Sequence, residues 1–312
     1  MVPMADALAA MGAEVVWLTS GRSGQWLRLR YPRAEHHELP SATVIYGPNA
    51  LWSVVRMMPA LSRAERAEQN WLAIHLPELR LNGLISDNRY GLHAPGLPAV
   101  LVTHQLAPRA TSGLHTLAAR IVARKLCRFD AVWVPDVSGM HSLAGDLAVN
   151  PYYGEVLHHI GLLSRFAMIK SQVSTAQTYA HVGLVSGPEH HRTRFEHALL
   201  ARFRATGLPC LIVCGLPATP FDRTEGNVRL VHHLNDEALA AALRGAGQIH
   251  CTAGYSTLMD LQVMGLKAQV TATPGQTEQT YLAQRYGTIH PFIGSNPGLL
   301  EKTLSEWTAW LG

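Results

Sequence analysis

Residues 249–265, IHCTAGYSTLMDLQVMG, carry the strongest structural pattern in the chain. The stretch begins as an apolar strand, passes through a turn of small residues at 252–254, and continues as a helix that opens at Ser256 or Thr257. Backbone N–H groups at a helix start lack intrahelical partners, and the helix dipole favours an anion there. The stretch therefore predicts a strand–turn–helix unit of an α/β domain with an anion site at the turn. Serine and threonine are also ordinary helix N-caps, so a capped helix without a ligand site would explain the same residues.

Two neighbouring features extend this site. Asp260 lies one turn into the helix, where a carboxylate can accept hydrogen bonds from the two hydroxyls of a ribose, although it could equally be an exposed acid near the favourable end of the dipole. The next strand, 268–271, is followed by 273–279, TPGQTEQ, whose amides and carboxylate suit sugar hydroxyls because these need both donors and acceptors. By itself that loop could be a capped helix start. Together the features predict a site for a nucleotide diphosphate sugar.

Alternating strand and helix patterns run along the rest of the chain and predict two Rossmann-like α/β domains with parallel sheets. The N-terminal domain is expected at 1–165, a linker at 166–178 and a C-terminal domain at 179–312. Strands are expected at 14–18, 81–85, 98–103, 131–134, 181–185, 210–214, 228–230, 248–251 and 268–271. Helices are expected at 3–11, 64–76, 114–126, 192–205, 236–244, 257–264 and 299–311.

The chain opens on a helix. A domain of this kind normally begins with a central strand whose turn leads into the first helix. We therefore expect the first N-terminal strand and its turn to be missing from this sequence.

Polar residues follow the predicted N-terminal strands at the ends where open parallel sheets place ligands. Asp87 and His104 are accordingly candidates for a catalytic base or for acceptor contacts. The alternatives are that Asp87 caps the following turn and that His104 is a histidine whose hydrogen bonds are satisfied within the fold.

Composition excludes several other classes of function. Among 312 residues, 15% are charged and the net charge is only +4, with Lys and Arg dispersed, so nucleic acid is not an expected partner. The 17 histidines include adjacent pairs, whose side chains point to different sides of an element, and neither HExxH nor Cys-rich spacing accompanies them. We expect no metal site and no cofactor.

The location indicated is the cytoplasm. The 4 cysteines have no paired CxxC spacing, no signal peptide precedes them, and no apolar run is long enough to cross a bilayer. Residues 118–128, AARIVARKLCR, mix apolar and basic residues at helical spacing. They could form a peripheral contact with the inner face of the plasma membrane, or a packed helix with a solvated basic face.

The two C-terminal motifs, TAGYSTLMDLQVMG and TPGQTEQTYLA, resemble the donor-binding region of family 28-like glycosyltransferases of the GT-B type. That group contains the enzyme that adds N-acetylglucosamine to the lipid-linked peptidoglycan precursor. ISDNRYGLHAPGLPAVLVTHQL and IGLLSRF in the N-terminal half are similar to segments of a bacterial subgroup known only as glycosyltransferases.

The resemblance implies a metal-independent, inverting transfer of a hexose or N-acetylhexosamine from a nucleotide diphosphate sugar, with UDP as the nucleotide, to a saccharide or lipid-linked acceptor. Asp260 matches a ribose-binding position that is usually Glu, Gln276 matches a donor-sugar contact, and Leu234 would offer backbone contacts to uracil. The family's Gly-His pair before the first helix would lie just ahead of residue 1. The full donor site implied is Ser186, Gly187, Leu234, Thr252, Ala253, Gly254, Tyr255, Ser256, Thr257, Asp260, Gln276, Thr277, Glu278 and Gln279.

Two other functions remain open. A nucleotide-sugar 2-epimerase uses a similar donor domain, but it would bring several carboxylates to the sugar, and the N-terminal half offers few beyond Asp87 and Asp136. A non-catalytic nucleotide-sugar-binding protein would also preserve the C-terminal motifs.

Overall fold

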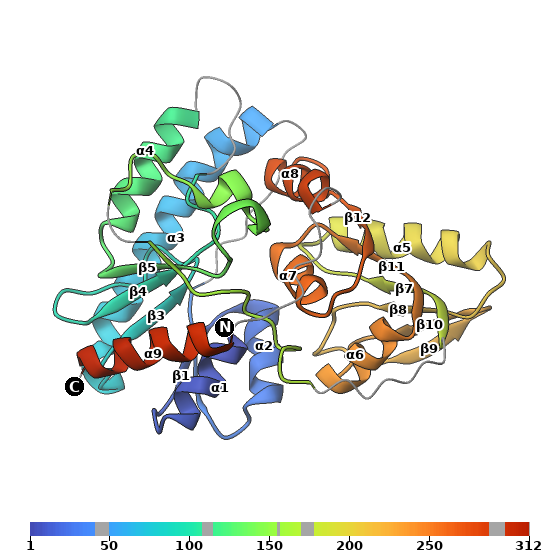
Figure 1. The fold of residues 1–312 in the computed structure, drawn as a ribbon, viewed down its shortest axis with the longest axis horizontal. Coiled ribbons are helices and arrows are strands. Elements are labelled where there is room, and N and C mark those ends of the chain that lie inside the picture. Colours follow the sequence, from blue (N-terminus) through green and yellow to red (C-terminus); the bar gives the residue numbers. More distant parts are fainter. Residues whose placement is uncertain (41–49, 108–114, 155–156, 170–177, 287–296, 312) are drawn as a thin grey trace.

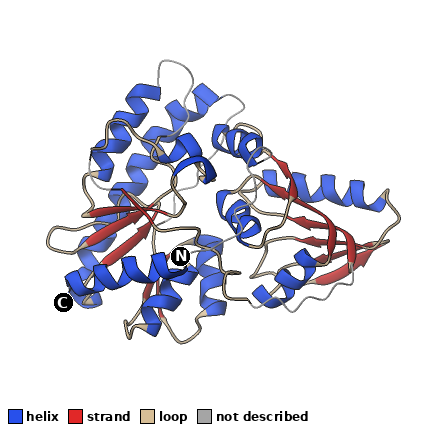
Figure 2. Cartoon of the chain, in the orientation of Figure 1, coloured by secondary structure: helices blue, strands red, loops and turns tan. Residues whose placement is uncertain are grey.

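The computed structural model describes residues 1–40, 50–107, 115–154, 157–169, 178–286 and 297–311, which form two α/β units lying side by side (Figure 1). Helices flank the strands of both units (Figure 2). In the described part of the chain, no helix combines the length and the apolar character needed to cross a bilayer. Cys210, Cys214 and Cys251 are buried free thiols.

The N-terminal unit contains two separate parallel sheets. The smaller pairs β1 (Val16–Thr19) with β2 (Glu35–Glu38). The larger has the order β3-β4-β5-β6, from β3 (Leu84–Asp87), β4 (Ala99–Val102), β5 (Ala131–Val134) and β6 (Leu157–His159). All of β4 is buried, as expected for an apolar strand inside a parallel sheet. The helices here are α1 (Val2–Ala10), α2 (Gly21–Arg30), α3 (Ala50–Leu79) and α4 (His115–Leu126), with short 3-10 helices η1 (Gly139–His141) and η2 (Gly145–Ala148).

The C-terminal unit is one sheet of six strands in the order β12-β11-β7-β8-β10-β9. Its strands are β7 (Tyr179–Leu184), β8 (Cys210–Val213), β9 (Asp222–Glu225), β10 (Val228–Val231), β11 (Ala246–Thr252) and β12 (Ala268–Thr271). Among these described strands, β9 and β10 pair antiparallel and the other neighbours pair parallel. The helices are α5 (His191–Arg204), α6 (Asp236–Arg244), α7 (Tyr255–Val263) and α8 (Thr277–Tyr286). The chain builds outward from β7 through β8 and β10, then crosses back to β11 and β12. The strand order therefore reverses between β7 and β11.

The last helix, α9 (Pro297–Leu311), returns to the N-terminal unit (Figure 1). It packs against α1, and the Trp307 ring lies 5.9 Å from the ring of Trp133 on β5. The Trp307 ring packs directly on the backbone of Gly83, where a Cβ atom would lie only 2.7 Å from the ring. The expected domain boundary grouped this helix with residues 179–286. The difference arises because the sequence pattern of an amphipathic helix shows that it has an apolar face but not which sheet the face will cover.

Several elements match the predicted ranges, and others have no clear sequence pattern. The strands predicted at 131–134 and 268–271 and the helix predicted at 236–244 coincide with β5, β12 and α6. In contrast, α2, β2, β6 and β9 were not predicted, and α3 is much longer than the range 64–76. The sequences of β2, EHHE, and β9, DRTE, contain no apolar residue, and hence lack the alternation that marks a half-buried strand.

Candidate functional site

The reversal of strand order between β7 and β11 is where open α/β sheets hold their ligands, outside the carboxyl ends of the strands. Ser186 follows β7 and Thr252 ends β11, and their hydroxyl oxygens lie 2.9 Å apart. Two residues predicted for the donor site, 66 positions apart in sequence, are therefore in direct contact at this point. Gly187 beside them has φ +101°, a conformation that L side chains rarely adopt, and no heavy atom lies within 4 Å of where its Cβ would be.

The start of α7 is the place where the sequence predicts an anion site, and its N-terminal N–H groups have no side-chain cap. Gly254 is its N-cap, and no side chain caps the helix. A Cβ at Gly254 would meet only the Thr257 hydroxyl, at 3.8 Å, so the backbone is open to close approach. Ser256 is exposed and Thr257 half-buried, whereas Ala253 and Tyr255 are buried. The uncapped N–H groups and the Ser256 hydroxyl are thus the groups offered to a ligand, and Ala253 and Tyr255 hold the turn in the core.

His104 and Glu278, predicted for different domains and different roles, contact each other across the two units. The Nε2 atom of His104 lies 2.8 Å from Oε1 of Glu278 in the first turn of α8. The imidazole stacks on the Tyr255 ring with centroids 3.8 Å apart and an interplanar angle of 1°. The Tyr255 hydroxyl in turn donates to the carbonyl oxygen of Pro135, at 2.9 Å. These contacts hold the imidazole ring of His104 in one orientation. Nε2 bonds to Glu278, and Nδ1 is the second ring nitrogen.

Of the residues predicted to bind the donor in the loop after β12, Gln279 forms a hydrogen bond within the loop, whereas Gln276 and Thr277 lie at the start of α8. The Oε1 atom of Gln279 accepts from the Thr273 backbone N–H at 2.9 Å, so this amide holds the loop itself. Gln276 is half-buried and Thr277 exposed at the start of α8. Leu234 lies apart from this loop, packed against the core just before Asn235, whose side chain caps α6. Gln276 and Thr277 therefore remain the stronger candidates for ligand contacts.

Asp260 contacts the segment that leads from the N-terminal unit towards the linker. Its Oδ1 atom accepts from the Ser164 hydroxyl at 2.7 Å, and its Oδ2 atom lies 3.7 Å from Nε of Arg165. Burial raises the pKa of Asp260 to about 6, against the lowering effects of Arg165 and Ser164, and Asp236 raises it further. A carboxyl group with this pKa changes charge close to neutrality.

This shift predicts a pH dependence that is opposite to that of a typical salt-bridged carboxylate. Between the ordinary value of 3.8 and about 6, the folded protein keeps the Asp260 proton that the unfolded chain has lost. Folding stability from this group is therefore full at low pH and falls as pH rises, by about 2–3 kcal/mol in total. Denaturant unfolding of the wild type and of Asp260→Asn from pH 4 to 7 should show the wild type losing stability relative to the variant. A constant difference across that range would contradict the assignment.

Asp87 is exposed at the end of β3. It lines a cavity of about 1040 Å³ whose other walls include Ser256 and Arg89. Asp87 and Val102 are paired across β3 and β4, and His104 follows two residues after Val102. Both candidates for the base consequently lie at the same edge of the N-terminal sheet, but Asp87 shares its cavity with the start of α7 and His104 bonds to α8.

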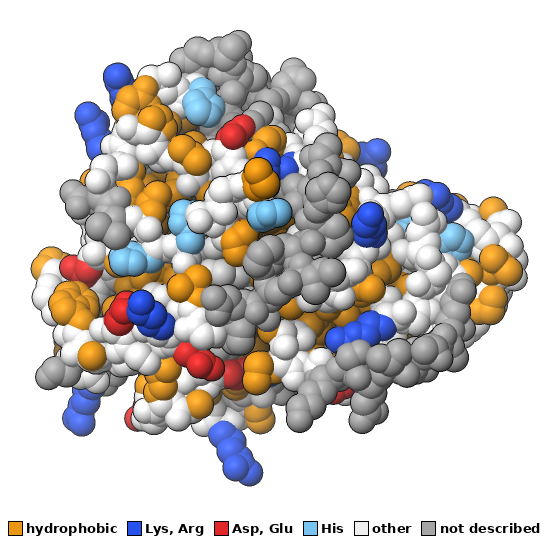
Figure 3. All heavy atoms as spheres, in the orientation of Figure 1, with side chains coloured by type: hydrophobic (Ala, Val, Ile, Leu, Met, Phe, Trp, Pro, Cys, Tyr) orange, Lys and Arg blue, Asp and Glu red, His pale blue; other side chains and the backbone are white. Residues whose placement is uncertain are grey.

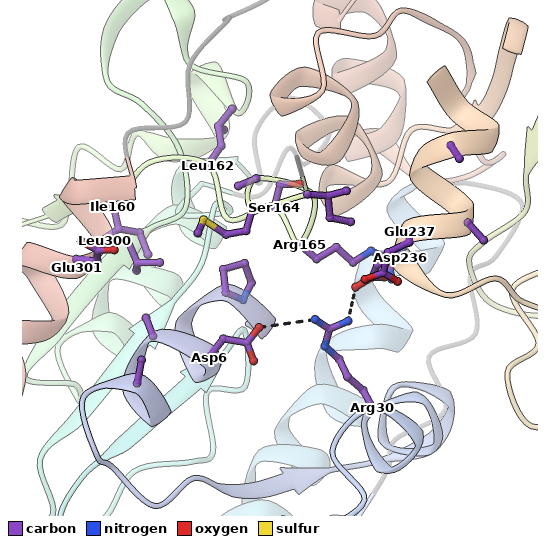
Figure 4. Close-up of a pocket in the computed structure, with 18 of the residues that line it drawn as sticks. Asp6, Arg30, Ile160, Leu162, Ser164, Arg165, Asp236, Glu237, Leu300 and Glu301 are labelled. Carbon is purple, nitrogen blue, oxygen red and sulfur yellow. Dashed lines mark hydrogen bonds and ion pairs between the residues drawn. The ribbon is translucent and has the colours of Figure 1, made fainter. Parts of the chain in front are cut away.

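A network of charged residues that local sequence patterns did not indicate joins α2 of the N-terminal unit to the start of α6 in the C-terminal unit. Arg30 on α2 forms ion pairs with Asp6 and with Asp236 at the start of α6, and Arg165 lies 3.2 Å from the same Asp236 carboxylate. Figure 4 shows these side chains converging on a cavity of about 1000 Å³. Local sequence gave no signal for it, because Arg30 and Asp236 are 206 positions apart and each resembles an ordinary helix-end charge.

Lys and Arg side chains are scattered over the face drawn in Figure 3 and do not form one basic patch there. Within the described ranges, no group of three or more His, Cys, Asp or Glu residues has an arrangement that could hold a metal ion.

Comparison with known proteins supports the fold through structure alone, since no family model and no curated protein matches the sequence. The glycosyltransferase SnogD from Streptomyces nogalater is 13% identical, with a TM-score of 0.56 covering 100% of this chain and 95% of that one. A variant of Os79 from O. sativa in complex with UDP is 12% identical, with a TM-score of 0.56 covering 98% and 87%. The glycotransferase of kitacinnamycin is 14% identical, with a TM-score of 0.56 covering 98% and 86%. The chain has the GT-B fold of these proteins, with two Rossmann-like units.

Proposed function

We propose that this chain is a glycosyltransferase that moves a hexose or N-acetylhexosamine from a nucleotide diphosphate sugar to an acceptor, with inversion and without a metal. The observation that carries the proposal is the uncapped start of α7, which lies beside the Ser186–Thr252 contact at the reversal of strand order. The GT-B fold supports it, because the similar structures named above are of glycosyltransferases and one of them holds UDP.

In this proposal the diphosphate binds at the turn between β11 and α7. Backbone N–H groups after Gly254 and the hydroxyls of Ser256 and Thr257 donate to its oxygens, and Gly187 leaves room on the opposite side. These donors stabilise the charge that grows on the leaving diphosphate, which is the main electrostatic demand of the reaction. Asp260 accepts from the ribose, Gln276 contacts the sugar, and the Leu234 backbone contacts the base.

The chemical step needs one proton acceptor. The acceptor hydroxyl oxygen forms a bond to the anomeric carbon, its proton passes to a base, and the bond to the diphosphate oxygen breaks with its electron pair. We assign the base to His104, because Glu278 and Tyr255 hold its ring in one orientation. Asp87 is the second candidate.

Donor binding is tested by titrating UDP into the protein calorimetrically. Asp260→Ala and Gln276→Ala should each weaken binding about tenfold, the effect of losing one or two hydrogen bonds worth about 1–2 kcal/mol. Gln269→Ala is the matched control, because Gln269 is an exposed glutamine on β12 outside the site. Unchanged affinity in both site variants would remove the donor assignment.

Incubation with UDP-sugars separates the three functions that the sequence leaves open. Transfer to a saccharide or lipid-linked acceptor supports the proposal. Release of an epimerised sugar without any acceptor would indicate a 2-epimerase, and binding without turnover would indicate a non-catalytic binding protein. Recovery of activity with membrane vesicles would support the further proposal of a peripheral membrane contact and a lipid-linked acceptor.

A further inference from the structure

The Asp236 carboxylate, in the first turn of α6, is bound by two guanidinium groups from outside its own unit. The Asp236 side chain is only 6% exposed. Its Oδ2 atom forms an ion pair with Nη1 of Arg30 on α2, and its Oδ1 atom lies 3.2 Å from Nη1 of Arg165 in the segment after β6. A buried carboxylate needs such partners, because its removal from water is costly. Arg30 and Arg165 therefore neutralise Asp236 together.

Arg165 is shared between Asp236 and a second carboxylate, that of Asp260 on α7. The Nε atom of Arg165 lies 3.7 Å from Oδ2 of Asp260, and this buried nitrogen has no hydrogen-bond partner among the described residues. One guanidinium carries one charge. How much of that charge compensates Asp260 therefore depends on how strongly Asp236 attracts Arg165, and hence on whether Asp236 has another partner.

Arg30 is that other partner, and the N-terminal unit holds it in place. Its Nη2 atom lies 3.7 Å from Oδ2 of Asp6 on α1, and its Nε atom donates to the Tyr31 hydroxyl at 3.3 Å. Its guanidinium carbon lies 5.8 Å from the centre of the Trp26 ring. Figure 4 shows the Arg30 guanidinium between the carboxylates of Asp6 and Asp236. These contacts direct the charge of Arg30 towards the start of α6.

We propose that Arg30 is a positioning residue for Asp260. By neutralising Asp236, it leaves Arg165 beside Asp260, which therefore stays a carboxylate that can accept from a ribose hydroxyl. A carboxylate accepts such hydrogen bonds more strongly than the neutral acid does. The ribose contact rests on the proposed function, whereas the effect of Arg30 on Asp260 does not. Arg30 acts through Asp236 and Arg165.

The charged groups around Asp260 come from several elements. Burial raises the pKa of Asp260 to about 6, and Asp236 on α6 raises it further. Arg165, the Ser164 hydroxyl and the amino group of Met1 lower it. Asp260 is consequently divided between its two protonation states near pH 6, where a small change in the surrounding charge alters the fraction of carboxylate.

The two partners of the Arg30–Asp236 ion pair act on Asp260 in opposite directions. Removing the charge of Arg30 leaves Asp236 uncompensated and draws Arg165 towards it, and both changes raise the pKa of Asp260. Removing the charge of Asp236 leaves Arg165 to Asp260 alone and lowers that pKa. An ion pair that only stabilised the fold would give losses in the same direction from either side.

UDP binding at two pH values tests the proposal. Calorimetric titration at pH 6 should show an affinity about fivefold lower in Arg30→Met and about twofold higher in Asp236→Asn, in proportion to the carboxylate form of Asp260. At pH 8 both variants should match the parent chain, because Asp260 is then ionised in all three. Arg28→Met is the matched control, because Arg28 lies on the same helix and pairs with Glu38. It should leave the affinity unchanged at both pH values.

Further variants separate the effect on Asp260 from a loss of structure. Arg30→Lys keeps the charge and should keep most of the parent affinity at pH 6. In an Asp260→Asn background, which cannot ionise at this position, Arg30→Met should no longer change the affinity. His233 and the Met1 amino group titrate nearby but are the same in every variant. Equal losses at pH 6 and pH 8, or a loss in Asp236→Asn as well as in Arg30→Met, would overturn the proposal.

NMR titration of the aspartate carboxyl carbons measures Asp260 without nucleotide. Its signal is identified by its absence from Asp260→Asn. The midpoint should move to higher pH by about one pH unit in Arg30→Met, and to lower pH in Asp236→Asn. An unchanged midpoint in both variants would overturn the proposal. Midpoints that move as expected in a chain that binds no UDP would refute the proposed function and leave the action of Arg30 on Asp260 established.

Discussion

Replacing Asp136 by alanine is expected to lower the free energy of unfolding by about 3–5 kcal/mol. Asp136 is fully buried after β5. Its carboxylate accepts from the backbone N–H groups of Val137, Leu143 and Ala144, at 2.7–3.0 Å, and from the Ser142 hydroxyl at 2.8 Å. Alanine would leave these donors without an acceptor in a site that water reaches poorly.

The loss should extend beyond the loop that Asp136 organises. The Ser142 carbonyl oxygen in that loop accepts two hydrogen bonds from Arg285 on α8, at 2.6 and 2.8 Å, so the loop is part of the contact between the units. Ser142→Ala is the comparison variant. It removes one hydrogen bond to Asp136 and the one that the Ser142 hydroxyl accepts from Gly145 N–H at 2.7 Å, and it should cost less than Asp136→Ala, about 1–2 kcal/mol. Urea unfolding monitored by circular dichroism measures both variants. Similar losses for the two would show that the carboxylate does not organise the loop.

Replacing His104 by alanine should lower kcat about 10²–10⁴-fold, the range that a general base contributes, with a much smaller change in UDP affinity. The proposed reaction cannot pass through its transition state without a group to take the acceptor proton. Glu278→Gln should have a smaller effect, about tenfold, because it keeps a hydrogen-bonding partner for Nε2 and removes only the charge that stabilises the imidazolium. Initial rates of UDP release from a UDP-sugar, at saturating donor, measure kcat for each variant.

Asp87→Asn distinguishes between the two candidates for the base. Asp87 is exposed at the end of β3, so the substitution preserves shape and should leave the thermal midpoint unchanged. If Asp87→Asn abolishes turnover while His104→Ala does not, the base is Asp87 and the His104–Glu278 contact serves to hold the two units together. Gln269→Ala again provides the baseline for a substitution outside the site.

The sequence was informative wherever a local pattern carries the physical signal. The alternating strand and helix patterns predicted β5, β12 and α6, because burial of one face dictates the spacing of residues a few positions apart. The same reasoning located the turn from β11 to α7. It also placed Ser186 and Thr252 at strand ends, although their contact depends on β7 and β11 being neighbours in the sheet.

Other features depended on elements that are distant in sequence. Nothing local indicates that His104 would reach Glu278, 174 positions away, or that Arg30 would pair with Asp236, because each of these residues has an ordinary loop or helix-end signature. Strand β2 pairs with β1. Its sequence, EHHE, has no alternation of apolar and polar residues that would predict a strand.

Local sequence patterns were enough to predict an α/β chain and to propose an anion site at the turn between β11 and α7, because both arguments use only backbone hydrogen bonding and the burial of nearby apolar residues. The strand neighbours, the packing of α9 against α1 and the cavity that β1 and β3 line together are visible only in the folded chain. Strand order and helix docking depend on how surfaces far apart in the chain pack together. The local pattern of a helix or strand shows only that it has an apolar face to bury, and not which surface will cover that face.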